Sequence, residues 1–454
     1  MKTFKLSSIH LIPLSFMGAI LIGTLLLILP VSSAAGSWTP FVDALFSATT
    51  SVCVTGLVVV DTFSYGSMFG QVVILLLIQI GGLGVITVVA TLMLVTRKHF
   101  SLSDRLMLRD AMNLETISGL LGFLARVVRG TLIVELIGAL LYMPAFIPRY
   151  GTARGIWASI FNAVSAFCNA GLDVLGPDSL ALYRGDPLVL IVTMFLIVAG
   201  GLGFVVWFDV IGKSVSGRKK SFSPRHIIES FSEHTKLVLS ITGVLIAAGW
   251  AFILITEFNN PETLGGMPVH LKILNSLFES VTFRTAGFAT FSQKALTDVS
   301  CVAAYFLMFI GGSPIGTAGG VKTTTFYLSL LNSHSYIRGK SSAHVFKRSV
   351  SDEQMMKATA IVDVAIGTVL LLTLLLISTN PVNLEDGLFE VVSACATVGL
   401  TRGVTPLLNT AGKLIITLGM YLGRIGPISM AIFLVGGRKE ETDVHYSEGN
   451  FYIG

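Results

Sequence analysis

The stretch Ala166-Phe167-Cys168-Asn169-Ala170-Gly171-Leu172 places a glycine after small or polar residues and before a large apolar residue. The same pattern occurs three more times, as Ser51-Val52-Cys53-Val54-Thr55-Gly56-Leu57, Thr282-Phe283-Arg284-Thr285-Ala286-Gly287-Phe288 and Ala394-Cys395-Ala396-Thr397-Val398-Gly399-Leu400. The pattern glycines lie 115, 116 and 112 residues apart. Such even spacing over most of a 454-residue chain indicates four copies of one unit.

Two further landmarks recur in each copy. A phenylalanine precedes the glycine by nine or ten residues, at Phe46, Phe161, Phe278 and Phe389. A second motif follows, as Ile80-Gly81-Gly82-Leu83-Gly84, Ala199-Gly200-Gly201-Leu202-Gly203, Ile310-Gly311-Gly312-Ser313-Pro314 and Leu422-Gly423-Arg424-Ile425-Gly426. The shared order of landmarks supports the repeat, and we interpret the glycines of the first two motif copies as helix-packing residues.

The composition indicates a polytopic membrane protein. The chain is 53% hydrophobic and 13% charged, whereas soluble domains carry roughly 25% charged residues. No Lys or Arg occurs between Lys5 and Arg97, and about 20 apolar residues suffice to cross a bilayer. The basic residues gather at Arg97–Arg129, Lys213–Lys236, Arg338–Lys357 and Arg438-Lys439. We expect these segments to be cytoplasmic, and since no nucleic-acid-reading module accompanies them, no nucleic-acid partner is expected.

Each copy is predicted to contain a spanning helix, a re-entrant half-helix, a turn and a second spanning helix. This order returns the chain to its starting face, so the copies share one orientation. The expected fold class is an all-α polytopic membrane protein with four parallel membrane–pore-helix–membrane repeats around a pseudo-fourfold central pore. The expected helices cover 11–31, 39–53 and 68–96; 119–147, 156–167 and 187–211; 236–256, 270–281 and an interrupted 298–333; and 358–378, 385–395 and 411–436.

The repeats also define the expected domain boundaries. Repeat one with its connector covers 1–118, and repeat two with a basic connector covers 119–234. Repeat three, with a broken second helix and a connector, covers 235–357, and repeat four covers 358–437. Residues 438–454 form a tail.

The four turns are candidate ion ligands. Non-helical backbone at membrane depth is tolerated where it lines a polar cavity or is buried in protein. Rings of carbonyl oxygens can replace the hydration shell of a monovalent cation, and the carboxyl ends of short helices add partial negative charge. No acidic residue occupies the turns, which argues against a divalent-cation site. The predicted selectivity filter comprises Val54, Thr55, Gly56, Asn169, Ala170, Gly171, Thr285, Ala286, Gly287, Thr397, Val398 and Gly399.

Four acidic residues lie near the turns, at Asp43, Asp61, Asp173 and Glu279. They either make the outer mouth negative or are solvated loop charges. The sequence leaves both alternatives open.

These motifs make the chain resemble the Trk/Ktr/HKT superfamily of cation transporters, specifically its Ktr-type membrane subunit, over nearly the whole length. In that family each repeat supplies one filter turn, and the turn glycine is the key selectivity residue. The resemblance implies potassium selectivity, with K+ at Gly56, Gly171, Gly287 and Gly399, because some plant members with serine at the first position admit sodium more freely. The resemblance also implies a homodimer contact at the tail Tyr446–Gly454.

The segment Gly311–Gly320 interrupts the second helix of repeat three because it is rich in glycine and proline. The resemblance implies an intramembrane loop that obstructs the pore below the filter. The alternative is a kink between packed helices. The predicted gate residues are Gly311, Gly312, Ser313, Pro314, Gly316, Thr317, Gly319, Gly320 and Arg424.

Four basic residues fall near the turns and the loop. Arg424 lies in the middle of a predicted span, where a charge is costly and usually functional. It resembles the family's pore-facing arginine, which would form an electrostatic barrier and hold the loop; the alternative is a structural salt bridge. Lys322 falls at the cytoplasmic boundary or just inside it. We expect Arg284 and Arg402 to be structural and to pair with Glu279 or Glu390.

The expected function is potassium uptake through a central pore, not an enzymatic activity. The sequence shows no nucleotide-binding fold, so this chain is expected to bind no nucleotide itself. The resemblance implies Na+ as an activator and a cytoplasmic nucleotide-binding regulatory ring (RCK type) as a partner, besides membrane lipid. It also implies a bacterial inner membrane location with cytoplasmic termini. An alternating-access cation symporter of another class is the alternative.

Overall fold

The protein, described here by a computed structural model, is almost entirely helical. The structure describes residues 8–85, 87–88, 90, 120–219, 223–339 and 342–426. The helices of the first half are α1 (Ser8–Ile28), α2 (Phe41–Cys53), α3 (Met68–Leu83), α6 (Leu120–Tyr150), α7 (Thr152–Cys168), α8 (Pro187–Gly201) and α9 (Phe204–Lys219). Those of the second half are α10 (Pro224–Glu229), α11 (Glu233–Glu257), α12 (Val269–Thr282), α13 (Asp298–Phe309), α14 (Thr323–Ile337), α15 (Asp352–Thr379), α16 (Leu384–Cys395) and α17 (Thr410–Ile425).

Short elements complete the connections. Single 3-10 turns cover Pro30–Ser32, Ala181–Tyr183, Gln293–Ala295 and Thr405–Leu407. Strands β1 (Ala343–Val345) and β2 (Arg348–Val350) form an antiparallel hairpin in which Ala343 pairs with Val350.

The helix starts follow from local sequence, because polar side chains cap the free N–H groups of the first turn. Ser67 accepts from the N–H of Gly70 at the start of α3, and Asn409 accepts from Gly412 at the start of α17. Asp186 caps α8, whose first residue is a proline, the position where a missing N–H costs nothing. The helices α2 and α12 instead begin directly after Pro40 and Pro268.

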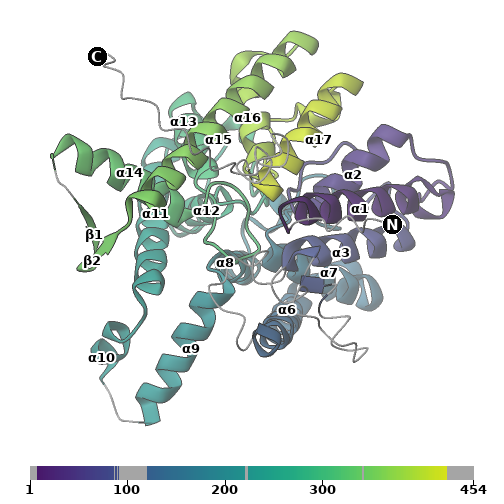
Figure 1. Cartoon of the computed structure of the whole chain (residues 1–454). Coiled ribbons are helices and arrows are strands. Elements are labelled where there is room, and N and C mark those ends of the chain that lie inside the picture. The colour runs from purple at the N-terminus through teal and green to yellow at the C-terminus, as the bar shows by residue number, and fades with distance from the viewer. Residues whose placement is uncertain are drawn as a thin grey trace, which may run out of the picture.

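The helices follow one another around a common centre (Figure 1), coloured from purple through blue and teal to yellow. Between consecutive groups, α3 packs on α7, α8 on α12, and α13 on α16. The last group closes the ring, since α17 packs on α2. The four landmark phenylalanines, Phe46, Phe161, Phe278 and Phe389, are all 0% exposed, so they form the core of this arrangement.

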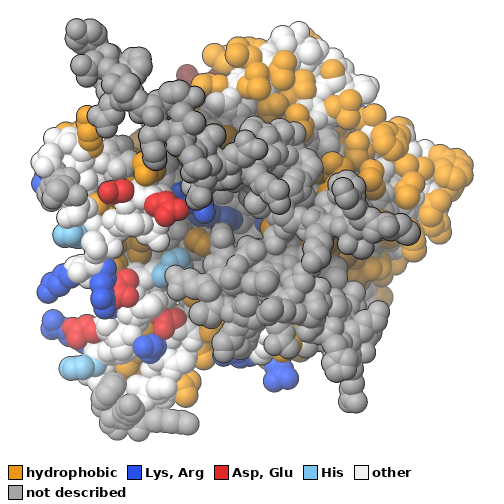
Figure 2. Space-filling model, viewed as in Figure 1, with side chains coloured by type: hydrophobic (Ala, Val, Ile, Leu, Met, Phe, Trp, Pro, Cys, Tyr) orange, Lys and Arg blue, Asp and Glu red, His pale blue; other side chains and the backbone are white. Residues whose placement is uncertain are grey.

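The outer surface is apolar where membrane lipid is expected. Leu25 of α1, Leu136 of α6, Ile255 of α11 and Leu374 of α15 are each at least 60% exposed. Four described helices are long and apolar enough to cross a membrane, or five if the bent pair α8–α9 counts as one span. Figure 2 shows apolar side chains over one side of the molecule and charged ones gathered on the opposite side, around α10 and the hairpin.

The second long helix of repeat two corrects one prediction. A continuous helix over 187–211 is wrong, because α8 and α9 meet at an angle of 100°. Gly203 at the break has φ +86°, and the N–H of Phe204 donates to the carbonyl of Ile315 instead of to its own helix. Gly84 and Gly426 have similar positive φ where α3 and α17 end. The last glycine of the second motif therefore ends a helix. The packing role predicted for Gly84 is wrong, because among the described residues only Thr87 Oγ1 lies within 4 Å of its Cβ position, whereas a Cβ on Gly203 would collide with the carbonyl oxygen of Pro314.

The packing role is confirmed for other glycines of that motif. A Cβ on Gly81 or Gly200 would collide with the carbonyl oxygen of Val52 or Phe167, and one on Gly82 would lie 2.5 Å from Cys168 Sγ. These glycines let α3 and α8, the second helices of copies one and two, approach the ends of the short helices α2 and α7 closely.

Candidate functional site

The four short helices α2, α7, α12 and α16 lead into the four turns that carry the pattern glycines, called here glycine turns one to four. Each turn holds one residue in the left-handed region, two positions before its glycine: Val54, Asn169, Thr285 and Thr397, with φ between 52° and 64°. The glycines themselves, Gly56, Gly171, Gly287 and Gly399, have φ between 64° and 99°. Two αL-type residues at each turn reverse the chain at the helix end.

The glycine turns lie against one another in chain order. A Cβ on Gly56 would lie 2.5 Å from the carbonyl oxygen of Ala170, and one on Gly171 would lie 2.7 Å from that of Ala286. A Cβ on Gly287 would lie 2.5 Å from Val398 O, and one on Gly399 would collide with Thr55 O. Each glycine thus faces the carbonyl that precedes the next glycine, and the fourth returns to the first. Only a residue without a side chain fits these positions.

Hydroxyl groups support two of these turns. Thr50 Oγ1 accepts from the N–H of Gly56 at 2.9 Å, and Ser393 Oγ accepts from that of Gly399 at 3.0 Å. Turn three departs from this pattern because Val281 occupies the matching position. There the Thr282 hydroxyl donates to the carbonyl of Phe288 at 2.6 Å instead.

The segment Gly311–Gly320, called here the gate loop, separates α13 from α14 and fits into the break between α8 and α9. The N–H of Ser313 donates to Gly201 O at 2.9 Å, and that of Thr317 donates to Gly200 O at 3.2 Å. The loop returns to its start at Gly311, whose N–H donates to Val321 O at 2.9 Å. The predicted break in repeat three is confirmed, and it is a hydrogen-bonded loop instead of a kink.

Thr317 joins the gate loop to glycine turn two. Its Oγ1 lies 3.0 Å from the carbonyl oxygen of Phe167 and 3.0 Å from Asn169 Oδ1. One hydroxyl carries one proton, whereas Asn169 Nδ2 has no other partner among the described residues. With the Asn169 amide turned over, Nδ2 donates to Thr317 Oγ1 and the Thr317 hydroxyl donates to the carbonyl of Phe167.

Arg424 touches the gate loop and the helix of another repeat. Its Nη1 donates to the carbonyl of Thr317 at 2.5 Å, and its Nη2 donates to the carbonyl of Gly81. No carboxylate of the described residues pairs with Arg424, so the alternative of a structural salt bridge finds no support there. Lys322 likewise binds the loop, because its Nζ donates to Ala318 O at 2.6 Å.

Residues 15–439 match the TrkH family, described as cation transport proteins. The chain belongs to this family. Ktr system potassium uptake protein B of Bacillus subtilis is 38% identical and covers 100% of the chain, with 98% of that protein matched. Potassium/sodium uptake protein NtpJ of Enterococcus hirae is 37% identical, with 99% of the chain and 98% of that protein matched.

The structural comparison agrees with the TrkH family assignment. The crystal structure of the potassium transporter TrkH from Vibrio parahaemolyticus superposes with a TM-score of 0.73. The match covers 96% of this chain and 86% of that chain at 15% identity, so it shows a common fold. The resemblance seen in the motifs is confirmed, and the chain is a multi-pass membrane transport protein and not an enzyme.

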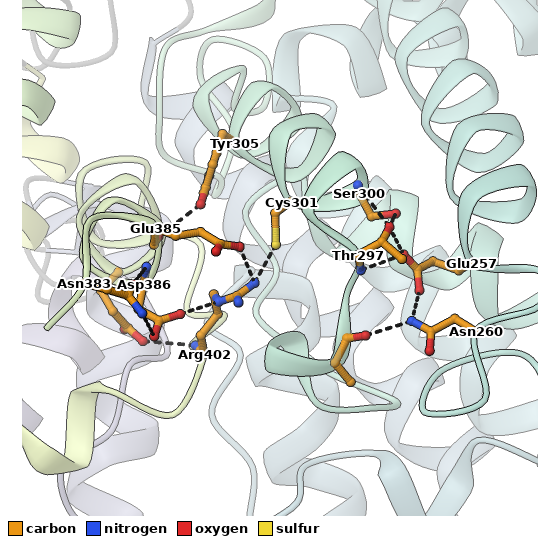
Figure 3. Close-up of polar contacts among 12 residues, drawn as sticks. Glu257, Asn260, Thr297, Ser300, Cys301, Tyr305, Asn383, Glu385, Asp386 and Arg402 are labelled. Carbon is orange, nitrogen blue, oxygen red and sulfur yellow. Dashed lines mark hydrogen bonds and ion pairs between the residues drawn. The ribbon is translucent and has the colours of Figure 1, made fainter.

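Two predicted ion pairs of this TrkH-family chain are wrong in their partners. The Arg402 side chain pairs with Asp386 at 2.6 Å and Glu385 at 3.2 Å (Figure 3). Arg402 reaches Glu390 only through its backbone N–H, and Glu390 also accepts from the hydroxyls of Thr401 and Thr405. Cys301 Sγ also accepts from Arg402 Nη1 at 2.6 Å. Glu385 and Asp386 lie about one helical turn nearer the start of α16 than Glu390. The Arg402 side chain, which follows glycine turn four, turns back toward them.

Arg284 departs further from the prediction. Its Nη2 donates to the carbonyl of Gly311 at 3.0 Å, so it binds the gate loop and not Glu279. Glu279 is 0% exposed and accepts from Gln293 Nε2 at 2.7 Å.

Some buried carboxylates escaped the sequence analysis. Glu257 accepts from the hydroxyl and N–H of Thr297 and from Asn260 (Figure 3). It also accepts from the Thr263 hydroxyl and so fixes the loops that flank α12. Glu135 of α6, 5% exposed, accepts from Gln79 of α3 at 3.3 Å. An acid inside an apolar helix was the available signal for Glu135, but its partner lies 56 residues away in sequence.

The four acidic residues predicted near the outer mouth lie in different environments. Asp43 pairs with Lys413 at 2.6 Å and Glu279 is buried, so neither is a free mouth charge. Burial, with a smaller contribution from the nearby carboxylate of Asp61, raises the pKa of Asp173 to about 6, against a hydrogen bond from the N–H of Leu175. No cluster of three or more His, Cys, Asp or Glu side chains suited to a metal ion occurs in the described parts of the chain.

Several predictions fall on residues that the structure does not describe. The tail 438–454 with its dimer contact and the connector 97–118 lie outside the described residues. The repeat boundaries remain predictions.

Proposed function

We propose that this chain is a potassium uptake subunit in which K+ passes along the axis between the four glycine turns. The relatives' names support the cargo, because Ktr system potassium uptake proteins B and D of Bacillus subtilis are 38% and 33% identical to it. The proposal includes four parallel membrane–pore-helix–membrane repeats, since the helices close a ring by packing α17 on α2.

One observation carries the selectivity filter. Each turn glycine faces, at contact distance, the carbonyl that precedes the next glycine, from Gly56 through Gly171 and Gly287 to Gly399. Backbone that converges without side chains leaves carbonyl oxygens as the groups that meet a permeating ion. Carbonyls are neutral ligands suited to K+, and the short helices aim their negative ends at the same place.

The gate in this proposal is the loop Gly311–Gly320 together with Arg424. The loop is tied by Thr317 to glycine turn two and by Arg424 to repeats one and four. A positive charge beside the axis repels cations, so Arg424 adds an electrostatic barrier while it holds the loop. Flux then requires these hydrogen bonds to break.

The proposed activator is Na+, and the proposed partners are a second copy of this chain and a cytoplasmic nucleotide-binding ring. The printed name of the Enterococcus hirae relative includes both potassium and sodium, and the other relatives are parts of a Ktr system. The charged side of the molecule around α10 and the hairpin (Figure 2) suits a cytoplasmic docking face. The proposal also places the protein in a bacterial inner membrane with cytoplasmic termini.

The test is potassium and rubidium uptake in cells that lack their own potassium uptake systems. We compare the wild type with Gly287→Ser and with a deletion of Gly312–Gly319. The filter predicts that Gly287→Ser loses the preference for K+ over Na+, and the gate predicts faster flux in the deletion. If Gly287→Ser keeps the preference for K+ and the deletion leaves the flux unchanged, these glycines only pack helices and the proposal is wrong.

A further inference from the structure

Arg284 is a buried cation at the junction of a glycine turn and the gate loop. It directly precedes Thr285 of turn three, it is 8% exposed, and its Nη2 donates to the carbonyl of Gly311 at 3.0 Å. Gly311 O is its one hydrogen-bond acceptor among the described residues, and its Nε has no partner there. No ion pair in the described parts of the chain includes Arg284.

An arginine held in this way is costly. A buried charge without a carboxylate partner is disfavoured, and an apolar residue of similar size is often at least as stable. Arg402 beside turn four shows the satisfied arrangement, since it pairs with both Asp386 and Glu385. Stability therefore does not account for Arg284, and an intramembrane charge of this kind points to function.

The acceptor is the point where the gate loop closes on itself. The N–H of Gly311 donates to Val321 O at 2.9 Å, and Ile310 and Val321 form a parallel bridge. These three residues are called here the loop neck. Arg284 holds the neck, whereas Arg424 holds the loop at Thr317, six residues further along the chain.

There is free space beside this contact. A small cavity is lined by Arg284, Val281, Gly201 and Gly312, among others. The guanidinium group thus lies between the end of α12, the end of α8 and the loop, beside a cavity that reaches Gly312, the residue after the neck.

We propose that Arg284 is a positioning residue that ties the neck of the gate loop to glycine turn three. Because Arg284 adjoins Thr285, displacement of the neck is transmitted to the turn, and two arginines hold the loop at two points, Gly311 and Thr317. This inference rests on the proposed function, since it requires the loop to limit flux. It assigns Arg284 to gating instead of to the structural role expected from the sequence.

The experiment is a double-mutant cycle on potassium uptake, with Arg284→Met, Arg284→Lys, the Gly312–Gly319 deletion, and Arg284→Met combined with the deletion. Methionine keeps the length and removes charge and donors, and surface abundance of each variant is measured alongside. We expect Arg284→Met to raise uptake on the order of tenfold, as for the loss of one charge-assisted hydrogen bond. Arg284→Lys should keep most of the restraint. Arg225→Met is the control on an exposed arginine whose recorded ion pair is with Glu229, far from the glycine turns in sequence.

The cycle separates the outcomes. The proposal expects Arg284→Met to have no further effect once the loop is deleted, because a cycle isolates the coupling between the two. An equal effect with and without the loop would overturn it and make Arg284 a charge barrier or a support of the turn. Unchanged uptake in Arg284→Met would also overturn it. If the deletion alone leaves uptake unchanged, the gate itself fails, which is a different result.

Discussion

Thr317 of the gate loop and Asn169 of glycine turn two are hydrogen-bonded side chain to side chain, with Thr317 Oγ1 3.0 Å from Asn169 Oδ1. Their separation in sequence is 148 residues, and both are buried. The loop and one proposed ion-binding turn are therefore in direct contact, and a change in one alters the hydrogen bonding of the other.

Removing the Thr317 hydroxyl should loosen the loop. Thr317→Val keeps the volume but loses the contacts with Phe167 and Asn169, so we expect uptake to rise several-fold, in line with about 1 kcal/mol per hydrogen bond. Potassium uptake at matched surface abundance is the measurement. Thr317→Ser keeps the hydroxyl and should behave as the wild type; if both variants match the wild type, the contact does not restrain the loop.

The ring of glycines should tolerate no methyl group. In Gly399→Ala the new Cβ meets the carbonyl of Thr55, so we expect loss of K+ preference or of uptake by at least tenfold. Gly403→Ala is the matched control, because Gly403 also has a positive φ, +85°, but nothing lies within 4 Å of its Cβ position. Competition of Na+ against rubidium uptake is the readout. If Gly399→Ala and Gly403→Ala reduced K+ preference or uptake equally, backbone strain alone would explain the loss and the contact with Thr55 would not be needed.

A packing glycine should affect stability instead of selectivity. A Cβ on Gly423 would collide with the carbonyl of Cys395, whereas one on Gly367 of α15 meets nothing within 4 Å. We expect Gly423→Ala to cost about 1–3 kcal/mol and Gly367→Ala to be neutral or stabilising. Unfolding of the purified protein in detergent gives both values, and a neutral Gly423→Ala would contradict the close approach of α17 to α16.

The buried ion pairs of Arg402 should be essential to the fold of turn four. Arg402→Met leaves Asp386 without its partner at 2.6 Å, and breaking a buried pair costs about 3–5 kcal/mol. Arg225→Gln removes a pair whose side chains are 88% and 57% exposed, which should cost less than about 1 kcal/mol. The same unfolding assay compares them. Similar stability of the two variants would argue against the buried network in Figure 3.

Uptake at low K+ should depend on the charge of Asp173. Its pKa is raised to about 6, so the carboxylate loses its charge as pH falls from 7 to 5, and we expect uptake to decrease with it. Since the folded state holds the proton more tightly than the unfolded state, the contribution of this group to stability grows as pH falls through 6. Asp173→Asn should remove this part of the pH profile; a profile that keeps its shape would exclude Asp173 as a mouth charge.

The repeat made much of the architecture predictable. Even spacing and the recurring phenylalanines located the four short helices within a few residues, because burial and helix-ending glycines are local signals. The glycine turns were identified from the same pattern, and their positive φ angles follow from it.

The partners of buried side chains were not predictable in the same way. Arg284 binds Gly311 across 27 residues and Glu135 binds Gln79 across 56, and such contacts depend on how helices pack. The bend between α8 and α9 was missed because a glycine pair inside an apolar run is compatible with both a straight and a broken helix. Only the loop that occupies the break decides between them.

The hydrogen bond from the N–H of Phe204 to the carbonyl of Ile315 links the first residue of α9 directly to the gate loop. This helix has 16 residues and is about 24 Å long, so a rotation of about 5° at the break moves its far end by about 2 Å. Any such rotation of α9 must either move Ile315 as well or break the hydrogen bond between Phe204 and Ile315. A displacement of the far end of α9, on the charged side of the molecule, would therefore act on the gate loop through Ile315.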